Sequence, residues 1–104
     1  MIEMNMQMIM QQAKKMQAQL QKTQEELEKT EYSGTSSLVS VKINGKFEVL
    51  EVKINLSDGE NIEFDDKDMF EDMISVAFNE AVKKANQDKE NKLGQYGQGL
   101  AGLM

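Results

Sequence analysis

The chain has 104 residues, enough for one small domain with a modest core. It contains no cysteine and no histidine, which excludes disulfides and thiolate metal sites and removes the commonest general base. The net charge is −6, and every one of the 12 basic residues is a lysine, which suits sequence-tolerant phosphate contacts better than bidentate reading of guanine. We therefore expect no enzyme, no cofactor and no metal site. No apolar run is long enough to predict a membrane span, and no signal peptide is evident.

The first element is predicted to be a long helix over residues 1–31, because helix formers fill it and neither Gly nor Pro interrupts it. Its apolar residues follow alternating steps of three and four, which is typical of an a/d heptad seam. We interpret this seam as a helix or dimer packing surface, with an adaptable surface for a protein partner as the alternative. The seam comprises Ile2, Met6, Ile9, Ala13, Met16, Leu20, Thr23, Leu27 and Thr30.

A three-stranded antiparallel meander is expected next, with a weak first strand around residues 31–36. Asn44-Gly45 predicts a type I′ hairpin, in which both central residues take a positive φ. In the following strand the apolar parity changes between Val49 and Leu50, which indicates a bulge or a strand buried on both faces. The strand residues assigned to packing are Val39, Val41, Ile43, Val52 and Ile54.

A second helix should begin at Asp65 or Asp66, where acidic residues favour the positive end of the helix dipole, and should fade near Lys92. The order α-β-β-β-α predicts an α+β fold with the helices on one face of a small sheet. We expect a single domain over residues 1–93, made of a helical arm (1–31), a sheet (32–56), an acidic loop (57–64) and the second helix (65–93), followed by a flexible Gly-rich tail (94–104).

The charges are segregated along the chain. Met4 to Gln24 holds three lysines and no acid, whereas Ser57 to Asp72 holds eight acids and one lysine. If the two helices project together, their basic stretches can share one end of the molecule and contact phosphates. For any single lysine, ordinary solvated surface is the alternative. The candidates for phosphate contact are Lys14, Lys15, Lys22, Lys83, Lys84, Lys89 and Lys92; Lys29 is left out because glutamates surround it.

Acidic residues at the start of the second helix could suggest a cation site. Their spacing fits no calcium-binding loop, and helix capping explains acids at this position. We therefore expect a capping role for them. The sequence also contains no Gly-rich phosphate loop of the nucleotide-binding kinds.

Four blocks of sequence, in the right order and at about the right spacing, resemble the YbaB/EbfC family of nucleoid-associated proteins. They are LVSVKING (Leu38–Gly45), EVLEVKI (Glu48–Ile54), DKDMFED (Asp66–Asp72) and FNEAVKKA (Phe78–Ala85). The resemblance implies a homodimer paired through the sheet regions, with the long helices projecting as the arms of a tweezer-like body. It also implies weakly specific binding of duplex DNA. The chain departs from the family pattern in a longer acidic loop after Ile54 and in a reduced Gly-rich stretch before Leu38.

We therefore expect a bacterial, cytoplasmic, nucleoid-associated homodimer that binds duplex DNA with little sequence specificity and influences nucleoid organisation and gene expression. No membrane and no small-molecule substrate is expected as a partner. The alternative is a prefoldin-like coiled-coil chaperone or assembly adaptor that binds protein partners through its Met-rich helix end. Suppression of client aggregation without DNA affinity would favour that alternative.

Overall fold

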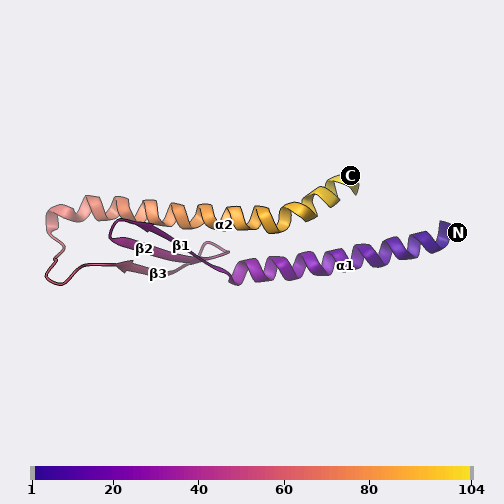
Figure 1. Cartoon of the computed structure of the whole chain (residues 1–104), viewed down its shortest axis with the longest axis horizontal. Helices are drawn as coiled ribbons and strands as arrows, with labels where there is room; N and C mark the ends of the chain where they lie inside the picture. Colours follow the sequence, from indigo (N-terminus) through magenta and orange to yellow (C-terminus); the bar gives the residue numbers. More distant parts are fainter. Residues whose placement is uncertain (1, 104) are drawn as a thin grey trace.

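The computed structural model shows an elongated molecule of 77 × 20 × 15 Å and describes the backbone of residues 2–103 and the side chains of residues 5–94. The strands form one antiparallel sheet in the order β1-β2-β3. Both helices extend from the sheet toward the end of the molecule where the two termini lie, and the loop before α2 lies at the other end (Figure 1). The elements are α1 (Ile2–Lys29), β1 (Glu31–Ser36), β2 (Val39–Asn44), β3 (Val49–Ile54), the 3-10 turn η1 (Phe64–Asp66) and α2 (Lys67–Leu103). The predicted α-β-β-β-α fold is confirmed.

The core lies between α2 and the first two strands. Small residues on one face of α2 let its backbone come close to the sheet, and Gly34 on β1 continues this close approach. A Cβ at Gly34 would overlap the carbonyl oxygen of Ala77 and lie 2.6 Å from the backbone nitrogen of Ala81. The buried residues of this core are Tyr32, Val39, Val41, Ile43, Phe70, Ala77, Ala81 and Ala85.

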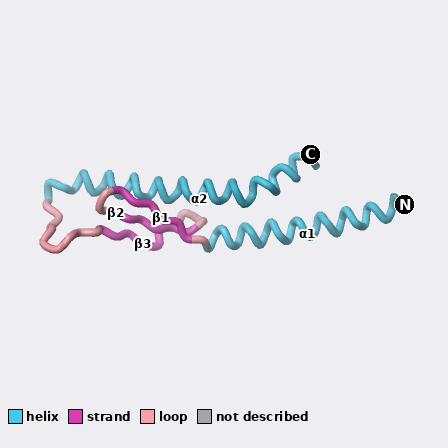
Figure 2. The backbone as a smooth tube through the Cα atoms, in the orientation of Figure 1, coloured by secondary structure: helices cyan, strands magenta, loops and turns pink. Residues whose placement is uncertain are grey.

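β3 is not covered by α2. Among the described residues, α2 packs on β1 and β2, and its backbone does not come close to β3. Figure 2 shows β3 on the side of the sheet away from α2. Val52 pairs with Val41 and Ile54 with Val39, so both point to the same face as the core. They nevertheless remain 47% and 41% exposed.

The predicted irregularity in this strand is present as a bulge. Ile43 pairs with Val49 and Lys42 with Glu51, so Leu50 is the extra residue. Both Val49 and Leu50 are exposed. Of the two interpretations of the parity change, the bulge is therefore confirmed and a strand buried on both faces is wrong for the single chain.

Over the described side chains, α1 is attached to the body through its last turns. Leu27 is buried there, and the hairpin between β2 and β3 closes on the end of the helix, where the Gly45 N–H donates a hydrogen bond to the Glu28 carbonyl at 3.2 Å. A Cβ at Gly45 would overlap the carbonyl oxygen of Leu27. This hairpin therefore satisfies one terminal carbonyl of α1 and fixes the direction in which the helix leaves the sheet.

The prediction of a type I′ turn at Asn44-Gly45 is wrong, because neither residue has a positive φ. The Phe47 N–H donates to the Asn44 carbonyl at 2.9 Å, and Phe47 itself takes the positive φ of 65°. The Asn44 side chain accepts hydrogen bonds from the backbone N–H groups of Lys46 and Glu48. The loop is thus a longer one, held by the Asn44 side chain. Gly45 is required for close packing rather than for its φ.

The second helix begins close to the predicted position and ends later. Its start is preceded by η1, where the Asp66 carboxylate accepts a hydrogen bond from the Glu63 N–H, so the expected capping role is confirmed for Asp66. The end expected near Lys92 is wrong, since α2 continues to Leu103. Gly lowers helix propensity by about 1 kcal/mol, but extending an existing helix avoids the cost of nucleation. The side chains of residues 95–104 lie outside the described part.

Candidate nucleic-acid interface

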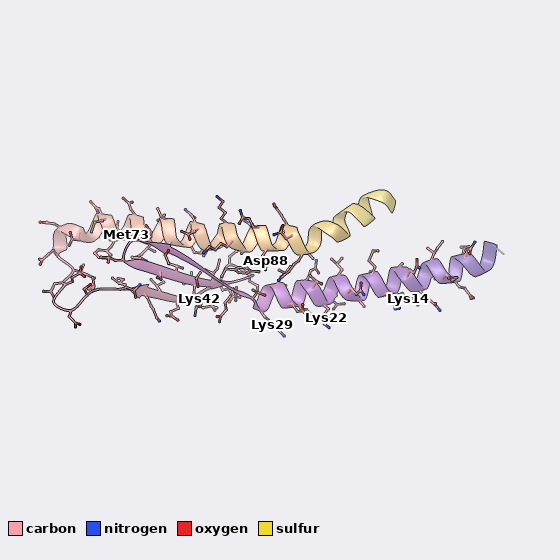
Figure 3. The ribbon with its side chains drawn as sticks, viewed as in Figure 1. Lys14, Lys22, Lys29, Lys42, Met73 and Asp88 are labelled. Atoms are coloured by element: carbon pink, nitrogen blue, oxygen red, sulfur yellow. The ribbon has the colours of Figure 1, made fainter. Side chains whose placement is uncertain are left out.

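The three α1 lysines lie on a helix arm that extends beyond the sheet. Lys14, Lys15 and Lys22 are exposed, and among the side chains at positions 5–94 none of them forms an ion pair. At 100° per residue, Lys15 and Lys22 lie on the side of the helix opposite the apolar seam. Figure 3 shows Lys22 turned away from α2. Their charges are therefore available to an external anion.

The four predicted lysines of α2 are in two different situations. Lys83 and Lys89 are exposed and make no ion pair within the described side chains. Lys84 donates a hydrogen bond to the Ser33 carbonyl at 2.9 Å and pairs with Glu80 at 3.4 Å. Lys92 pairs with Asp88 at 3.1 Å. Lys84 is thus engaged in a contact that holds α2 against β1, whereas the ion pair of Lys92 lies within α2.

Tyr32 and Asp88 join β1 to α2 close to the point where α1 leaves the sheet. The Tyr32 hydroxyl donates to the Asp88 carboxylate at 2.6 Å. Burial, and then the hydrogen bond with Asp88, raise the pKa of Tyr32 to about 12. The same hydrogen bond, helped by Lys92, lowers the pKa of Asp88. Sequence reasoning missed this pair, which lies 56 positions apart; a lone aromatic residue at a strand start was the only signal.

The outer face of the sheet carries lysines as well, but acids balance them. Lys42 lies 3.8 Å from Glu31 and 3.9 Å from Glu51, and Lys53 lies 3.0 Å from Glu51. These pairs leave little net positive potential on this face. An anion is therefore attracted more strongly to the arm of α1.

The acidic stretch lies at the end of the molecule opposite the N-terminal arm (Figure 1). This separation favours an orientation in which a polyanion meets the arms and not the loop. Phe64, in the same stretch, is 90% exposed. Among the described residues, no group of three or more acidic side chains is arranged to hold a metal ion.

The residues predicted for packing fall into three groups. Val39, Val41 and Ile43 are covered by α2 of the same chain, and Leu27 is buried where α1 meets the hairpin. Val52 and Ile54 form an uncovered apolar surface on β3. The third group, on the part of α1 beyond the sheet, is exposed or half-buried and comprises Met6, Ile9, Met16 and Leu20.

Neither α1 nor α2, over the residues that the structure describes, is apolar enough along its length to cross a bilayer.

Comparison with known proteins connects this arrangement to one family. Residues 3–100 match the model of the YbaB/EbfC DNA-binding family. A nucleoid-associated protein of Chloroflexus aurantiacus is 40% identical over 102 residues, which cover 96% of this chain and 99% of that protein. A nucleoid-associated protein of Hahella chejuensis is 37% identical, with 96% and 91% of the two chains covered.

The fold is found in a solved structure too. An uncharacterized protein from Helicobacter pylori superposes with a TM-score of 0.65 at 20% sequence identity, covering 85% of this chain and 91% of that one. The family match spans nearly the whole chain, and the relatives are bacterial nucleoid-associated proteins. The chain therefore belongs to the YbaB/EbfC DNA-binding family.

Proposed function

We propose that the protein is a homodimer that binds duplex DNA through lysine–phosphate contacts, with little sequence specificity. The observation that carries this proposal is the set of exposed lysines that make no ion pair among the described side chains. Lys14, Lys15 and Lys22 lie on the part of α1 that extends away from the acidic loop, and Lys83 and Lys89 lie on α2. Phosphate contacts of this kind provide most of the affinity in sequence-independent DNA binding. The absence of arginine removes the fork that most often reads guanine.

The homodimer is supported by the apolar surface that the single chain leaves uncovered. Val52 and Ile54 on β3 are continuous with Ile74 on the flank of α2, because Ile54 and Ile74 line one groove together with Phe70. A two-fold interface brings the same patch together from both copies. Covering this patch would remove apolar side chains from water and complete the thin core of the single chain.

The proposed location is the nucleoid in the bacterial cytoplasm, where duplex DNA is abundant. There, a binder with little sequence preference covers many sites and changes the path and accessibility of the duplex. An influence on nucleoid organisation and gene expression follows from such coverage rather than from recognition of one operator.

The test is DNA affinity measured by fluorescence anisotropy with two duplexes of unrelated sequence, over a range of salt concentrations. The variant called the arm variant changes Lys14, Lys15 and Lys22 of α1, together with the unpaired Lys83 of α2, to Gln. Lys89 is kept, because it lines the notch between α1 and α2 with Gln24 and Leu27. The matched control changes four lysines that the structure shows in ion pairs, namely Lys42, Lys46, Lys53 and Lys67.

Both variants lose four positive charges in each chain, so an effect of net charge alone would be the same in both. We expect the arm variant to lose about a hundredfold in affinity for both duplexes and to show a shallower salt dependence, while the control changes by less than about threefold. Equal losses in the two variants would refute the arm lysines as the site. A wild-type protein that binds neither duplex at low salt and micromolar concentration would refute DNA binding itself.

One observation favours the second candidate, a chaperone or assembly adaptor. Met6, Met8, Ile9 and Met10 expose between 57% and 61% of their surface on the arm, and exposed methionines adapt to varied apolar partners. Light scattering of an aggregating client protein separates the two functions. The adaptor function would replace DNA binding if the wild type suppressed client aggregation and had no DNA affinity. Changing Met8 and Met10 to Gln should then abolish the suppression.

A further inference from the structure

The apolar seam of α1 continues beyond the part that the chain itself covers. At the C-terminal end of the seam Leu27 is buried against the body, whereas Met6 near the N-terminal end is 61% exposed and Ile9 is 60% exposed. Residues 5–19 thus carry a heptad seam in which every a and d position is apolar, but which has no covering element among the described side chains.

The residues that flank the seam carry no charge that could select a partner helix of opposite charge. With Met6 at position a, the e and g positions between residues 5 and 24 hold Asn5, Met10 and the glutamines Gln12, Gln17, Gln19 and Gln24. In coiled coils these flanking positions usually carry the charges that select partner and orientation. Here they are uncharged, so two copies of the same helix meet without repulsion.

The lysines of the arm occupy positions that keep them out of such a contact. Lys14 falls at b, and Lys15 and Lys22 fall at c, all on the outer side of the helix. A helix pair formed through the seam therefore leaves these lysines exposed to solvent. Pairing and phosphate contact are compatible on the same arm.

The seam is also complementary in shape to itself when two copies run antiparallel. With the two-fold axis near Gln11, Ile9 of one copy lies opposite Ala13 of the other, so that a branched side chain meets a small one. Met6 of one copy lies opposite Met16 of the other. A parallel pair would place Ala13 opposite Ala13, leaving a gap, and would align the two helix dipoles.

We propose that the α1 arms of two copies pair as an antiparallel coiled coil through Met6, Ile9, Ala13 and Met16. This contact goes beyond the DNA-binding dimer, because it uses a different surface from β3 and requires no DNA. The seam from Met6 to Met16 is about 15 Å long at 1.5 Å per residue, so a single pair of arms is weak. Copies held close together on DNA have a high effective concentration, which strengthens a weak contact. Paired arms then link neighbouring copies or two duplexes.

The register makes the proposal testable by cross-linking. The natural chain has no cysteine, so single cysteines report one position each. In the antiparallel pair, position 5 of one copy lies beside position 19 of the other, whereas two copies of position 5 lie far apart. Full-length Asn5→Cys and Gln19→Cys proteins are mixed without DNA, allowed to exchange subunits, and treated with a short thiol-specific cross-linker.

We expect the mixture to cross-link about tenfold faster than either variant alone. Ala18→Cys, on the outer side of the same helix, is the matched control and should cross-link slowly. Adding Met6→Gln and Met16→Gln to both reporters should return the mixture to the control rate. These methionines are exposed, so the melting temperature should not change.

Two results would overturn the proposal. Faster cross-linking of Asn5→Cys alone than of the mixture would show that the helices pair in parallel. A mixture no faster than Ala18→Cys would show that a second copy does not occupy the seam. Neither result affects the proposed DNA-binding function, which is measured separately by anisotropy.

Discussion

The two helices are attached to the sheet in opposite ways. α2 lies along β1 and β2, and its contact depends on Gly34 and on small residues such as Ala77 and Ala81. Among the described side chains, α1 contacts the body through its last turns, where Leu27 is buried and Gly45 of the hairpin lies against the Leu27 carbonyl. The body therefore depends on close backbone approach, whereas most of α1 depends on helix propensity and is exposed along its length.

Because of this difference, substitutions in the body and substitutions on α1 should change different properties of the protein. A change in the body should alter the free energy of unfolding, because buried atoms have no room to move. A change on the outer side of α1 should alter what the protein binds and leave folding nearly unchanged. The following substitutions test this division, from the largest expected effect to the smallest.

Gly34→Ala should have the largest effect. The added Cβ would overlap the carbonyl oxygen of Ala77, and since the obstacle is backbone, α2 must move away from β1. We expect a loss of about 3 kcal/mol in the free energy of unfolding, measured by urea denaturation at constant protein concentration.

Gly94→Ala is the matched control, because nothing lies within 4 Å of a Cβ at that position and it falls inside a helix. It should stabilise the protein by up to about 1 kcal/mol. If Gly34→Ala were equally harmless, α2 would not rest on β1 as closely as described.

Gly45→Ala should have the next largest effect, since its Cβ would overlap the end of α1 at Leu27. The hairpin loop can shift more easily than a helix in the core, so we expect a loss of about 2 kcal/mol. Urea denaturation measures this loss, and spin labels on α1 and α2 would show a changed distance between the arms.

The neighbouring Lys46→Ala substitution serves as the comparison for Gly45→Ala. It removes only the exposed contact of 4.0 Å with Glu28 and should cost less than about 0.5 kcal/mol. A larger loss from Lys46→Ala than from Gly45→Ala would contradict the close docking of this loop on α1.

Tyr32→Phe should cost about 1 kcal/mol, the typical net value of one hydrogen bond, because only the hydroxyl that binds Asp88 is lost. The pKa of Tyr32 is raised from 10.0 to about 12 in the folded chain. A raised value means that the contribution of this group is complete below pH 10 and disappears as the pH rises toward 12.

Absorbance of tyrosinate checks the Tyr32 prediction directly. The wild type should show an ionisation step near pH 12 that is absent from Tyr32→Phe, and the stability difference between the two proteins should shrink above pH 10. A titration curve of the same shape in both proteins above pH 10 would mean that Tyr32 ionises as an ordinary surface tyrosine.

The sequence predicted the elements of the fold well, because they rest on local patterns. The heptad steps of α1, the alternation from Val39 to Ile43 and the change of parity at Leu50 are all visible without the structure, although the sequence did not decide between a bulge and a strand buried on both faces. The two glycine contacts are not, since they depend on which backbone lies opposite. Asn44-Gly45 shows the difference: the dipeptide correctly indicated a hairpin, but its glycine serves packing against α1.

The candidate site was predictable as a charge pattern and not as a set of contacts. The sequence shows seven lysines on two basic stretches, but it does not show that Lys84 reaches Ser33 or that Lys92 pairs with Asp88. These partners lie on another element or one helical turn away and compete with any phosphate. Likewise, residues such as Val52 and Val41 have the same pattern in sequence, and only the position of α2 leaves one exposed and the other buried.

The smallest effects are expected from Lys42→Gln and Lys15→Gln, which compare one lysine of the body with one of the arm. Lys42 contacts Glu31 and Glu51 at 3.8 and 3.9 Å with a partly exposed side chain, so its removal should cost less than about 0.5 kcal/mol. Its removal should leave DNA affinity unchanged, because the acids that remain on the outer face do not attract phosphate.

Lys15→Gln should leave stability unchanged and weaken DNA binding about threefold, the effect of one phosphate contact. Urea denaturation measures the stability of both variants, and anisotropy measures their DNA affinity. The division between body and arm requires that each variant change at most one of these two properties. A loss of DNA affinity in Lys42→Gln that matched the loss in Lys15→Gln would extend the binding surface onto the sheet and remove that division.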